Sequence, residues 1–149
     1  MSETTFDFGW GQVPVHRHEN GNGWVADTAM VEDSCYIGID ALVYGDARVC
    51  GNARVYGDAL VCGDARVYGN ARVCGGARVC GDADLFVVQG IAEWGTATFF
   101  RTKDEPRVVI GCRYFTENEA IARWDHREDR KATLRLIRFV FEEFRKQCK

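Results

Sequence analysis

The sequence predicts a mainly β fold in which residues 25–95 wind into a parallel β-helix. The first observation is a six-residue period, in which an aliphatic residue recurs between Val25 and Leu85 and a small residue lies two positions before it. The second is that Gly, mostly followed by Asp or Asn, recurs between Gly45 and Gly81. Residues two apart on a strand share a face, and Gly, Asp and Asn suit tight turns. Each repeat is therefore expected to form a short strand followed by a corner.

The bulk composition suits one soluble domain. The chain has 149 residues, 46% of them hydrophobic, and a formal net charge of -3. That charge predicts no global attraction to a membrane or to nucleic acid, and we expect no sequence-specific nucleic-acid binding, so an anionic partner would need a local patch. No apolar stretch approaches the ~18 residues of a transmembrane helix, and the N-terminus lacks a signal-peptide pattern, which favours a cytoplasmic protein.

Residues 1–24 are expected to cap the first coil, because a solenoid end exposes its core and its strand edges. The segment is aromatic and contains His16 and His18, which would share one side of an extended strand. Two such ligands make an incomplete metal site, so we predict no metal. The seven cysteines contain no C-x-x-C pair, and we expect reduced thiols that pack as small apolar residues.

The repeat resembles the hexapeptide-repeat family, whose left-handed β-helices use about eighteen residues per triangular coil. The resemblance implies a left-handed coil in which residue n lies against residue n+18. With that stacking, the outward residues sort into three sides. One side is mostly apolar, and its residues are Trp24, Leu42, Tyr44 and Leu60. The other two sides carry Arg and Tyr, namely Arg48, Arg66 and Tyr68 on one and Arg54, Arg72 and Tyr56 on the other.

Two further elements are predicted after the coil. Residues 96–115 contain two apolar stretches around a Lys-Asp-Glu-Pro turn, which indicates a β-hairpin. Residues 116–149 form a helical tail, with a capping box at Thr116 and Glu119. The final helix is amphipathic, with its apolar seam at Leu134, Ile137, Phe141 and Phe144.

The apolar side of the coil needs a cover, because large exposed apolar patches are uncommon on monomers. We expect the final helix to provide it, by docking on its own coil, on a neighbouring chain's coil or on its own copies. The apolar side and the helix seam together are the predicted assembly interface. Family habit implies a homotrimer.

A closer resemblance rests on residues 21–29, the uniform repeats, and residues 98–104 and 110–116 before a helical tail. This combination is similar to hexapeptide-repeat proteins of bacteriophages and prophages. That group has no settled activity, although its members are often labelled transferases. The resemblance implies a small phage accessory protein that acts in the bacterial host cytosol.

Most enzymes of the hexapeptide-repeat class are acyltransferases that use a His as general base. No His lies between residues 19 and 125, and every repeat has six residues, which leaves no loop to wall a substrate pocket. Cys74 would be a nucleophile only with a neighbouring His to lower its pKa, and none is near in sequence. We therefore predict a protein without catalytic residues or a cofactor, and keep an acyltransferase as the alternative.

The Arg and Tyr residues of the two polar sides are the candidate binding residues, because guanidinium groups hold phosphates and aromatic rings stack. The alternative is that Asp46, Asp58, Asp64 and Asp82 neutralise these arginines on a solvated surface. Together with the phage resemblance, the pattern predicts an anti-defence, anti-CRISPR-like inhibitor. It would bind a host defence protein or sequester a nucleotide signal. A structural role in the virion is a second alternative.

Overall fold

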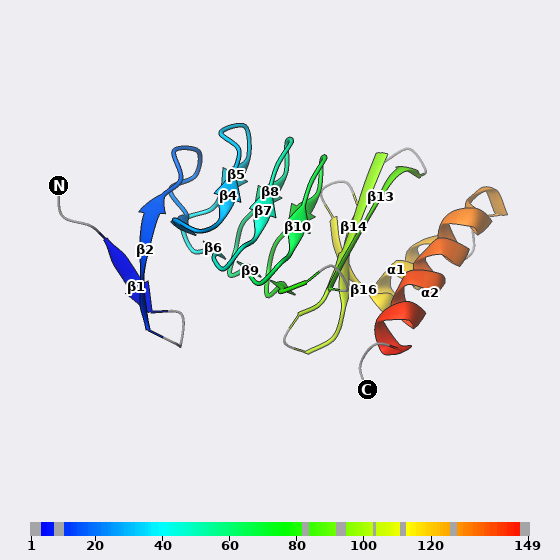
Figure 1. Ribbon diagram of the computed structural model, residues 1–149. Helices are drawn as coiled ribbons and strands as arrows, with labels where there is room; N and C mark the ends of the chain where they lie inside the picture. The colour runs from blue at the N-terminus through cyan, green and yellow to red at the C-terminus, as the bar shows by residue number, and fades with distance from the viewer. Residues whose placement is uncertain are drawn as a thin grey trace.

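The computed structural model describes residues 4–7, 11–81, 84–91, 95–102, 104–110, 113–125 and 128–146. It confirms a mainly β protein built on a parallel β-solenoid of about three turns (Figure 1). An antiparallel sheet and two helices follow the solenoid in sequence and in space.

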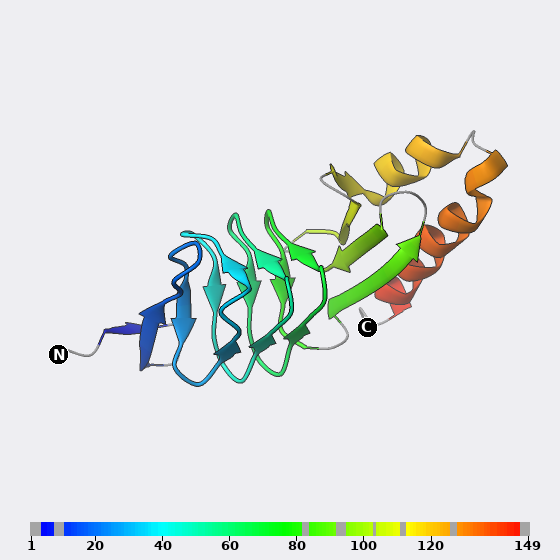
Figure 2. The ribbon, with the colours of Figure 1, turned by 90° about the horizontal axis from the view of Figure 1, so that it is seen from above.

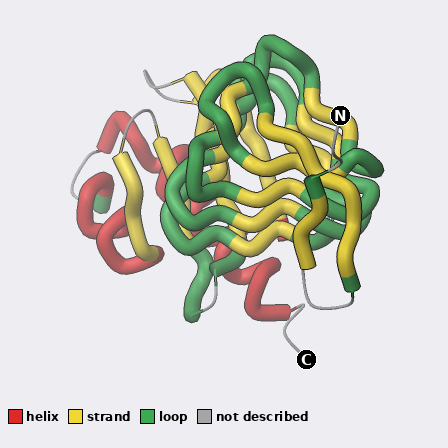
Figure 3. The backbone as a smooth tube through the Cα atoms, turned by 90° about the vertical axis from the view of Figure 1, so that its left-hand side faces the viewer, coloured by secondary structure: helices red, strands yellow, loops and turns green. Residues whose placement is uncertain are grey.

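The solenoid is made of very short strands that form three parallel sheets. The sheet orders are β3-β6-β9-β12, β4-β7-β10 and β5-β8-β11. Each strand pairs with the one eighteen residues along, so that Val25 lies opposite Val43 and Val43 opposite Val61. Figure 3, seen from the N-terminal end, shows strands of successive turns lying side by side. The strands are β3 (Trp24–Ala26), β4 (Met30–Val31), β5 (Tyr36–Ile37), β6 (Leu42–Val43), β7 (Arg48–Val49), β8 (Arg54–Val55), β9 (Leu60–Val61), β10 (Arg66–Val67), β11 (Arg72–Val73) and β12 (Arg78–Val79).

The corners need glycine for two reasons. Gly45 has φ 70°, in the left-handed region that favours glycine. A Cβ placed on it would also lie 2.8 Å from the backbone nitrogen of Gly63, one turn further on. The second and third turns therefore stack closely at this corner because both residues lack a side chain.

The core of the solenoid is a column of small and β-branched side chains. Ala and Val from successive turns, such as Ala47, Val49 and Val67, are almost completely buried. Phe100 and Val109 from the C-terminal sheet belong to the same cluster, so they close the end of the column. Burying each Val contributes about 1.5–3 kcal/mol, which offsets the entropy of ordering such short strands.

The N-terminal residues lie over the first turn. Strands β1 (Thr5–Asp7) and β2 (Gln12–Arg17) form a hairpin, and β2 pairs antiparallel with β3. Residues 18–23 cover β5, where the Gly23 N–H donates to the Ile37 carbonyl at 2.8 Å and the Ile37 N–H donates to Asn20 at 3.0 Å. Of the predicted cap aromatics, residues 8 and 10 lie outside the described ranges.

After β12 the chain leaves the solenoid for a four-stranded antiparallel sheet. Its strands are β13 (Leu85–Ile91), β14 (Gly95–Phe100), β15 (Arg107–Ile110) and β16 (Arg113–Thr116), in that order. The strands predicted within residues 96–115 are β14 and β15, which pair antiparallel. The repeat was expected to run through Leu85, but Leu85 pairs with Phe100 instead. An Asp84–Arg101 ion pair at 2.9 Å and the Arg78 N–H bonded to the Arg101 carbonyl at 2.7 Å direct the chain into the sheet.

The two helices cover the face of this sheet that points away from the solenoid (Figure 2). Helix α1 (Glu117–Trp124) begins with the predicted capping box, in which Glu119 N–H donates to the Thr116 hydroxyl at 3.1 Å and Thr116 N–H donates to the Glu119 carboxylate at 2.9 Å. A 3-10 turn (Glu128–Arg130) precedes α2 (Lys131–Lys146). Within the described ranges, no helix combines the length and apolar character that a bilayer-spanning segment requires.

The expected docking of the final helix is wrong for the chain's own coil, because the helix packs on the C-terminal sheet instead. Phe141 packs edge-to-face on Phe99 of β14 and Phe144 on Phe86 of β13, with ring centroids 5.8 Å and 5.2 Å apart. Ile137 is buried in the same cluster, and Leu134 is half-buried. One face of the sheet packs on the solenoid, and without the helices its other, apolar face would be open to solvent, so the helix buries that face rather than the side of the coil. The apolar side of the coil instead packs against Val15 of β2.

The expectation of reduced thiols is wrong for one pair of cysteines. Cys62 and Cys80 form a disulfide between neighbouring turns. Stacking brings their Cα atoms to 4.4 Å, within the range of about 4.4–6.8 Å that a disulfide needs. Cys35, Cys50 and Cys74 are free thiols in the described part of the chain.

Candidate functional site

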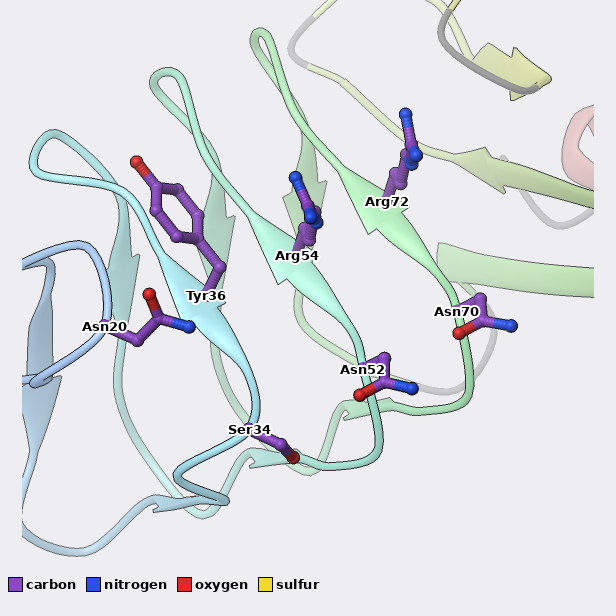
Figure 4. A pocket seen from close by; sticks show the side chains of 7 residues that line it. All are labelled: Asn20, Ser34, Tyr36, Asn52, Arg54, Asn70 and Arg72. Atoms are coloured by element: carbon purple, nitrogen blue, oxygen red, sulfur yellow. The ribbon is translucent and has the colours of Figure 1, made fainter.

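A polar groove of about 530 Å³ runs along the sheet β5-β8-β11 and the corner that precedes it (Figure 4). Two rows of side chains line it. The strand row consists of Tyr36, Arg54 and Arg72, and the corner row consists of Ser34, Asn52 and Asn70; Asn20 joins them at the N-terminal end. The volume lies within the range of roughly 300–1,000 Å³ that small-molecule sites occupy.

The repeat itself places both rows. In each short strand the Val points into the core, so the preceding residue points outward. Tyr36 pairs with Arg54 and Arg54 with Arg72, which aligns the three side chains along the solenoid. Asn52 and Asn70 each follow a glycine of positive φ, Gly51 and Gly69, and so occupy equivalent corner positions.

The groove carries two positive charges without a carboxylate in its lining. Among the described residues, no ion pair within 4.0 Å involves Arg54 or Arg72. At the inter-strand spacing of ~4.8 Å, two unit charges in water repel by about 1 kcal/mol. A bound anion would remove this repulsion.

The corner row supplies uncommitted hydrogen-bonding groups. In the described part of the chain, neither Asn52 nor Asn70 has a side-chain hydrogen bond. The Ser34 hydroxyl donates to the Gly51 carbonyl, which leaves its oxygen as an acceptor. Each free amide offers two donors and an acceptor. The groove is therefore lined by one neutral amide at the corner before each Arg strand.

Tyr36 forms the N-terminal end of the strand row and is 37% exposed. The backbone of Gly21 lies against its ring, since a Cβ on Gly21 would approach Tyr36 Cε2 to 3.0 Å. No ring or guanidinium contact of Tyr36 exists among the described residues. A planar group can therefore contact this ring from the groove.

The second Arg row differs in its corner residues. Arg48 and Arg66 line a smaller hollow of about 280 Å³ together with Asp46 and Asp64. The corner carboxylates thus share a hollow with this Arg row, although no ion pair within 4.0 Å joins them among the described residues. At the third corner, Asp58 precedes the strand of Leu60 and accompanies no Arg row. Asp82 lies outside the described residues.

The two predicted stacking tyrosines do not line the groove. Tyr56 packs against the solenoid core, and burial together with a hydrogen bond to Cys74 raises its pKa to about 12. Tyr68 is 50% exposed, but it stands on the sheet of Arg48 and Arg66. The tyrosine that lines the groove is Tyr36.

Three residues considered for chemistry are engaged in the structure. Cys74 is 6% exposed, and burial raises the pKa of its thiol, which disfavours the reactive thiolate. His18 is buried and its Nε2 lies 2.8 Å from the Cys35 carbonyl, whereas His16 Nδ1 lies 2.7 Å from Asp27. The two histidines therefore contact different groups. Among the described residues, no three His, Cys, Asp or Glu side chains gather as a metal site would require.

Sequence reasoning found Arg54 and Arg72 but missed the residues that distinguish their side. These are Asn20, Ser34, Tyr36, Asn52 and Asn70. The signal was present in the corners, because Asn recurs at positions 52 and 70 while Asp recurs at 46 and 64. Sorting the corner residues by eighteen, as well as the strand residues, would have separated the two sides.

A family model described as YdcK Beta solenoid repeat matches residues 47–63 and 65–81. The matched residues run from β7 to β12 and include Arg54 and Arg72, but they make up less than half of the chain. No curated protein and no solved structure matches. The similarity supports a repeat β-solenoid protein and carries no activity.

Proposed function

We propose that this chain is a non-catalytic binding protein that holds a phosphate-bearing ligand in the groove of Arg54 and Arg72. One observation carries the proposal: Arg54 and Arg72, which form no ion pair among the described residues, lie one turn apart in a groove whose other lining residues are neutral. Guanidinium groups bind phosphate oxygens through paired, charge-assisted hydrogen bonds. The amides of Asn52 and Asn70 add donors at the same two levels.

Several observations support binding without chemistry. The groove lining contains no His, Cys, Asp or Glu that would serve as a general base or nucleophile. The buried Cys74 thiol, with its raised pKa, lies outside the lining. An open side of a rigid solenoid suits recognition, since its side chains are held by the register rather than by a mobile loop.

The proposal also covers the family, the assembly and the location of the protein. The residues quoted above support a left-handed, hexapeptide-repeat protein of the phage type, which assembles as a trimer and works in the host cytosol. Of the two anti-defence roles, a groove that binds phosphates favours the sequestering of a nucleotide signal over the covering of a defence protein.

Isothermal titration with inorganic pyrophosphate tests the binding site. We expect saturable binding that weakens as salt rises, because exposed charges are screened. Arg54→Gln with Arg72→Gln should abolish this binding. The matched control is Arg48→Gln with Arg66→Gln, which makes the same charge change on the other side and should leave binding intact.

Three outcomes would contradict the proposal. The first is that the wild-type protein binds neither pyrophosphate nor a nucleotide. The second is that both double variants lose binding equally, which would indicate an effect of net charge rather than a specific site. Turnover of acetyl-CoA would contradict its non-catalytic part. A thermal-shift measurement gives an independent readout, since a ligand at 100 times its Kd stabilises the folded state by about 2.7 kcal/mol.

A further inference from the structure

The groove has an order along the solenoid that a simple anion would not use. Three rungs follow one another, each one turn from the next. We call them the Tyr rung (Asn20, Ser34 and Tyr36), the first Arg rung (Asn52 and Arg54) and the second Arg rung (Asn70 and Arg72). Only the Tyr rung is uncharged.

From this order we infer that the ligand is a nucleoside diphosphate, with its base on Tyr36 and its two phosphates on Arg54 and Arg72. This inference rests on the proposed function. A nucleoside diphosphate presents a planar base, a sugar and two anionic groups in sequence, which is the order of the three rungs. Rungs at ~4.8 Å place one guanidinium beside each phosphate.

The Tyr rung has the chemistry that a base requires. The Tyr36 ring is backed by Gly21 and makes no other ring contact among the described residues, so it offers a stacking surface. Stacking on an aromatic ring accepts any base. The Asn20 amide lies at the same end of the groove and can donate to and accept from a base edge.

The phosphate end is held more firmly than a surface loop would be. The Arg72 backbone N–H donates to the Thr98 hydroxyl of β14 at 3.0 Å, which joins the second Arg rung to the C-terminal sheet. Arg72 is half-buried, whereas Arg54 is exposed. The terminal phosphate would thus meet a guanidinium whose strand is fixed from both sides.

The second Arg rung also sets the number of phosphates. A monophosphate reaches only Arg54 when its base lies on Tyr36, whereas a diphosphate reaches Arg54 and Arg72. The two arginines should therefore contribute differently to the binding of AMP and ADP. This difference distinguishes the inferred orientation from an unordered attraction of anions.

Titration calorimetry with ADP, AMP and inorganic pyrophosphate tests the inference. We expect ADP to bind about ten-fold more tightly than pyrophosphate, and Tyr36→Ala to remove that advantage while leaving pyrophosphate binding unchanged. Tyr68→Ala, which truncates a ring on another side, is the control and should change neither. Arg72→Gln should weaken ADP and leave AMP unchanged, whereas Arg54→Gln should weaken both.

The outcomes separate this inference from the proposed function. Pyrophosphate binding as tightly as ADP, or Tyr36→Ala leaving their ratio unchanged, would overturn the inference while the anion site stands. An equal effect of Arg72→Gln on AMP and ADP would overturn the orientation. Failure of all three ligands to bind the wild-type protein would overturn the proposed function itself.

Discussion

At the scale of single residues, the two polar sides of the solenoid differ by the replacement of an amide with a carboxylate. Arg54 and Arg72 stand beside Asn52 and Asn70, and Arg48 and Arg66 stand beside Asp46 and Asp64. The residue types have nearly the same size and suit the same corner. The difference therefore changes the electrostatic potential of a side while leaving its backbone unchanged.

This difference predicts a reciprocal exchange of binding. Asn52→Asp with Asn70→Asp should weaken pyrophosphate binding at least ten-fold, because a carboxylate then competes for each guanidinium and repels the ligand. Asp46→Asn with Asp64→Asn should create a second, weaker site at Arg48 and Arg66. Titration calorimetry measures both changes: the first as a change in affinity and the second as a change in stoichiometry. Unchanged affinity in the first variant would show that the corner residues do not select the side.

At the scale of elements, Arg101 connects the C-terminal sheet to the helix that covers it. Its Nε lies 2.9 Å from Asp84, and its Nη2 donates to the Phe144 carbonyl in α2 at 2.9 Å. The guanidinium also lies 4.9 Å from the centre of the Phe144 ring. The side chain is 18% exposed, so these contacts are screened little by solvent. One residue thereby fixes the end of the solenoid and the position of α2.

Arg101→Met should lower the free energy of unfolding by about 2–3 kcal/mol, since it leaves Asp84 and a helix carbonyl without their charged partner. Urea denaturation followed by tryptophan fluorescence measures this loss. The control is Arg138→Met, because Arg138 is 57% exposed and lies 3.9 Å from Asp125, and such a pair contributes ~0–1 kcal/mol. Equal effects of the two variants would contradict the connecting role of Arg101.

At the scale of the whole molecule, the apolar side of the coil remains a predicted assembly surface. Leu42 and Leu60 are half-buried on it, together with Val13 and Trp24. Helix α2, which was expected to cover this side, covers the C-terminal sheet instead. The prediction that remains is that this side contacts other copies of the chain. Such a contact does not require the helix.

Leu60→Asp should therefore disrupt assembly, because it places a charge in an apolar contact. Sedimentation velocity measures the oligomeric state, and far-UV circular dichroism checks that the solenoid is folded. Arg66→Asp, at the equivalent position of the next strand, is the matched control and should assemble normally. A Leu60→Asp protein with wild-type sedimentation and melting temperature would show that this side is no interface.

How far the sequence predicts this molecule depends on how local each feature is. The six-residue period predicted the short strands and their corners, and the resemblance to the hexapeptide-repeat family implied the eighteen-residue register in which Val25, Val43 and Val61 stack. The pairing of Leu85 with Phe100 was not, because Leu85 still fits the period and only a contact with a distant strand redirects it. The docking of α2 was missed for the same reason. An amphipathic seam shows that a helix is covered, but it does not identify the surface that covers it.

The sequence predicted the arginines of the candidate site but not its tyrosine. Arg54 and Arg72 stand out as charged residues in a regular row, whereas Tyr36 lies in a turn whose sequence departs from the later repeats. Tyr56 was preferred from its spacing alone, but the solenoid core and Cys74 engage its side chain. Exposure, which spacing does not report, decided between the two rings.

The constant register has one further consequence, for how such a protein changes over generations. Each turn contacts chiefly its two neighbours, and the amino-acid sequences of residues 43–60 and 61–78 are alike, so a whole turn can be added or removed without changing the contacts at either end. Every added turn would lengthen the groove by ~4.8 Å. The length of the ligand that fits is therefore a heritable trait, adjusted in steps of eighteen residues.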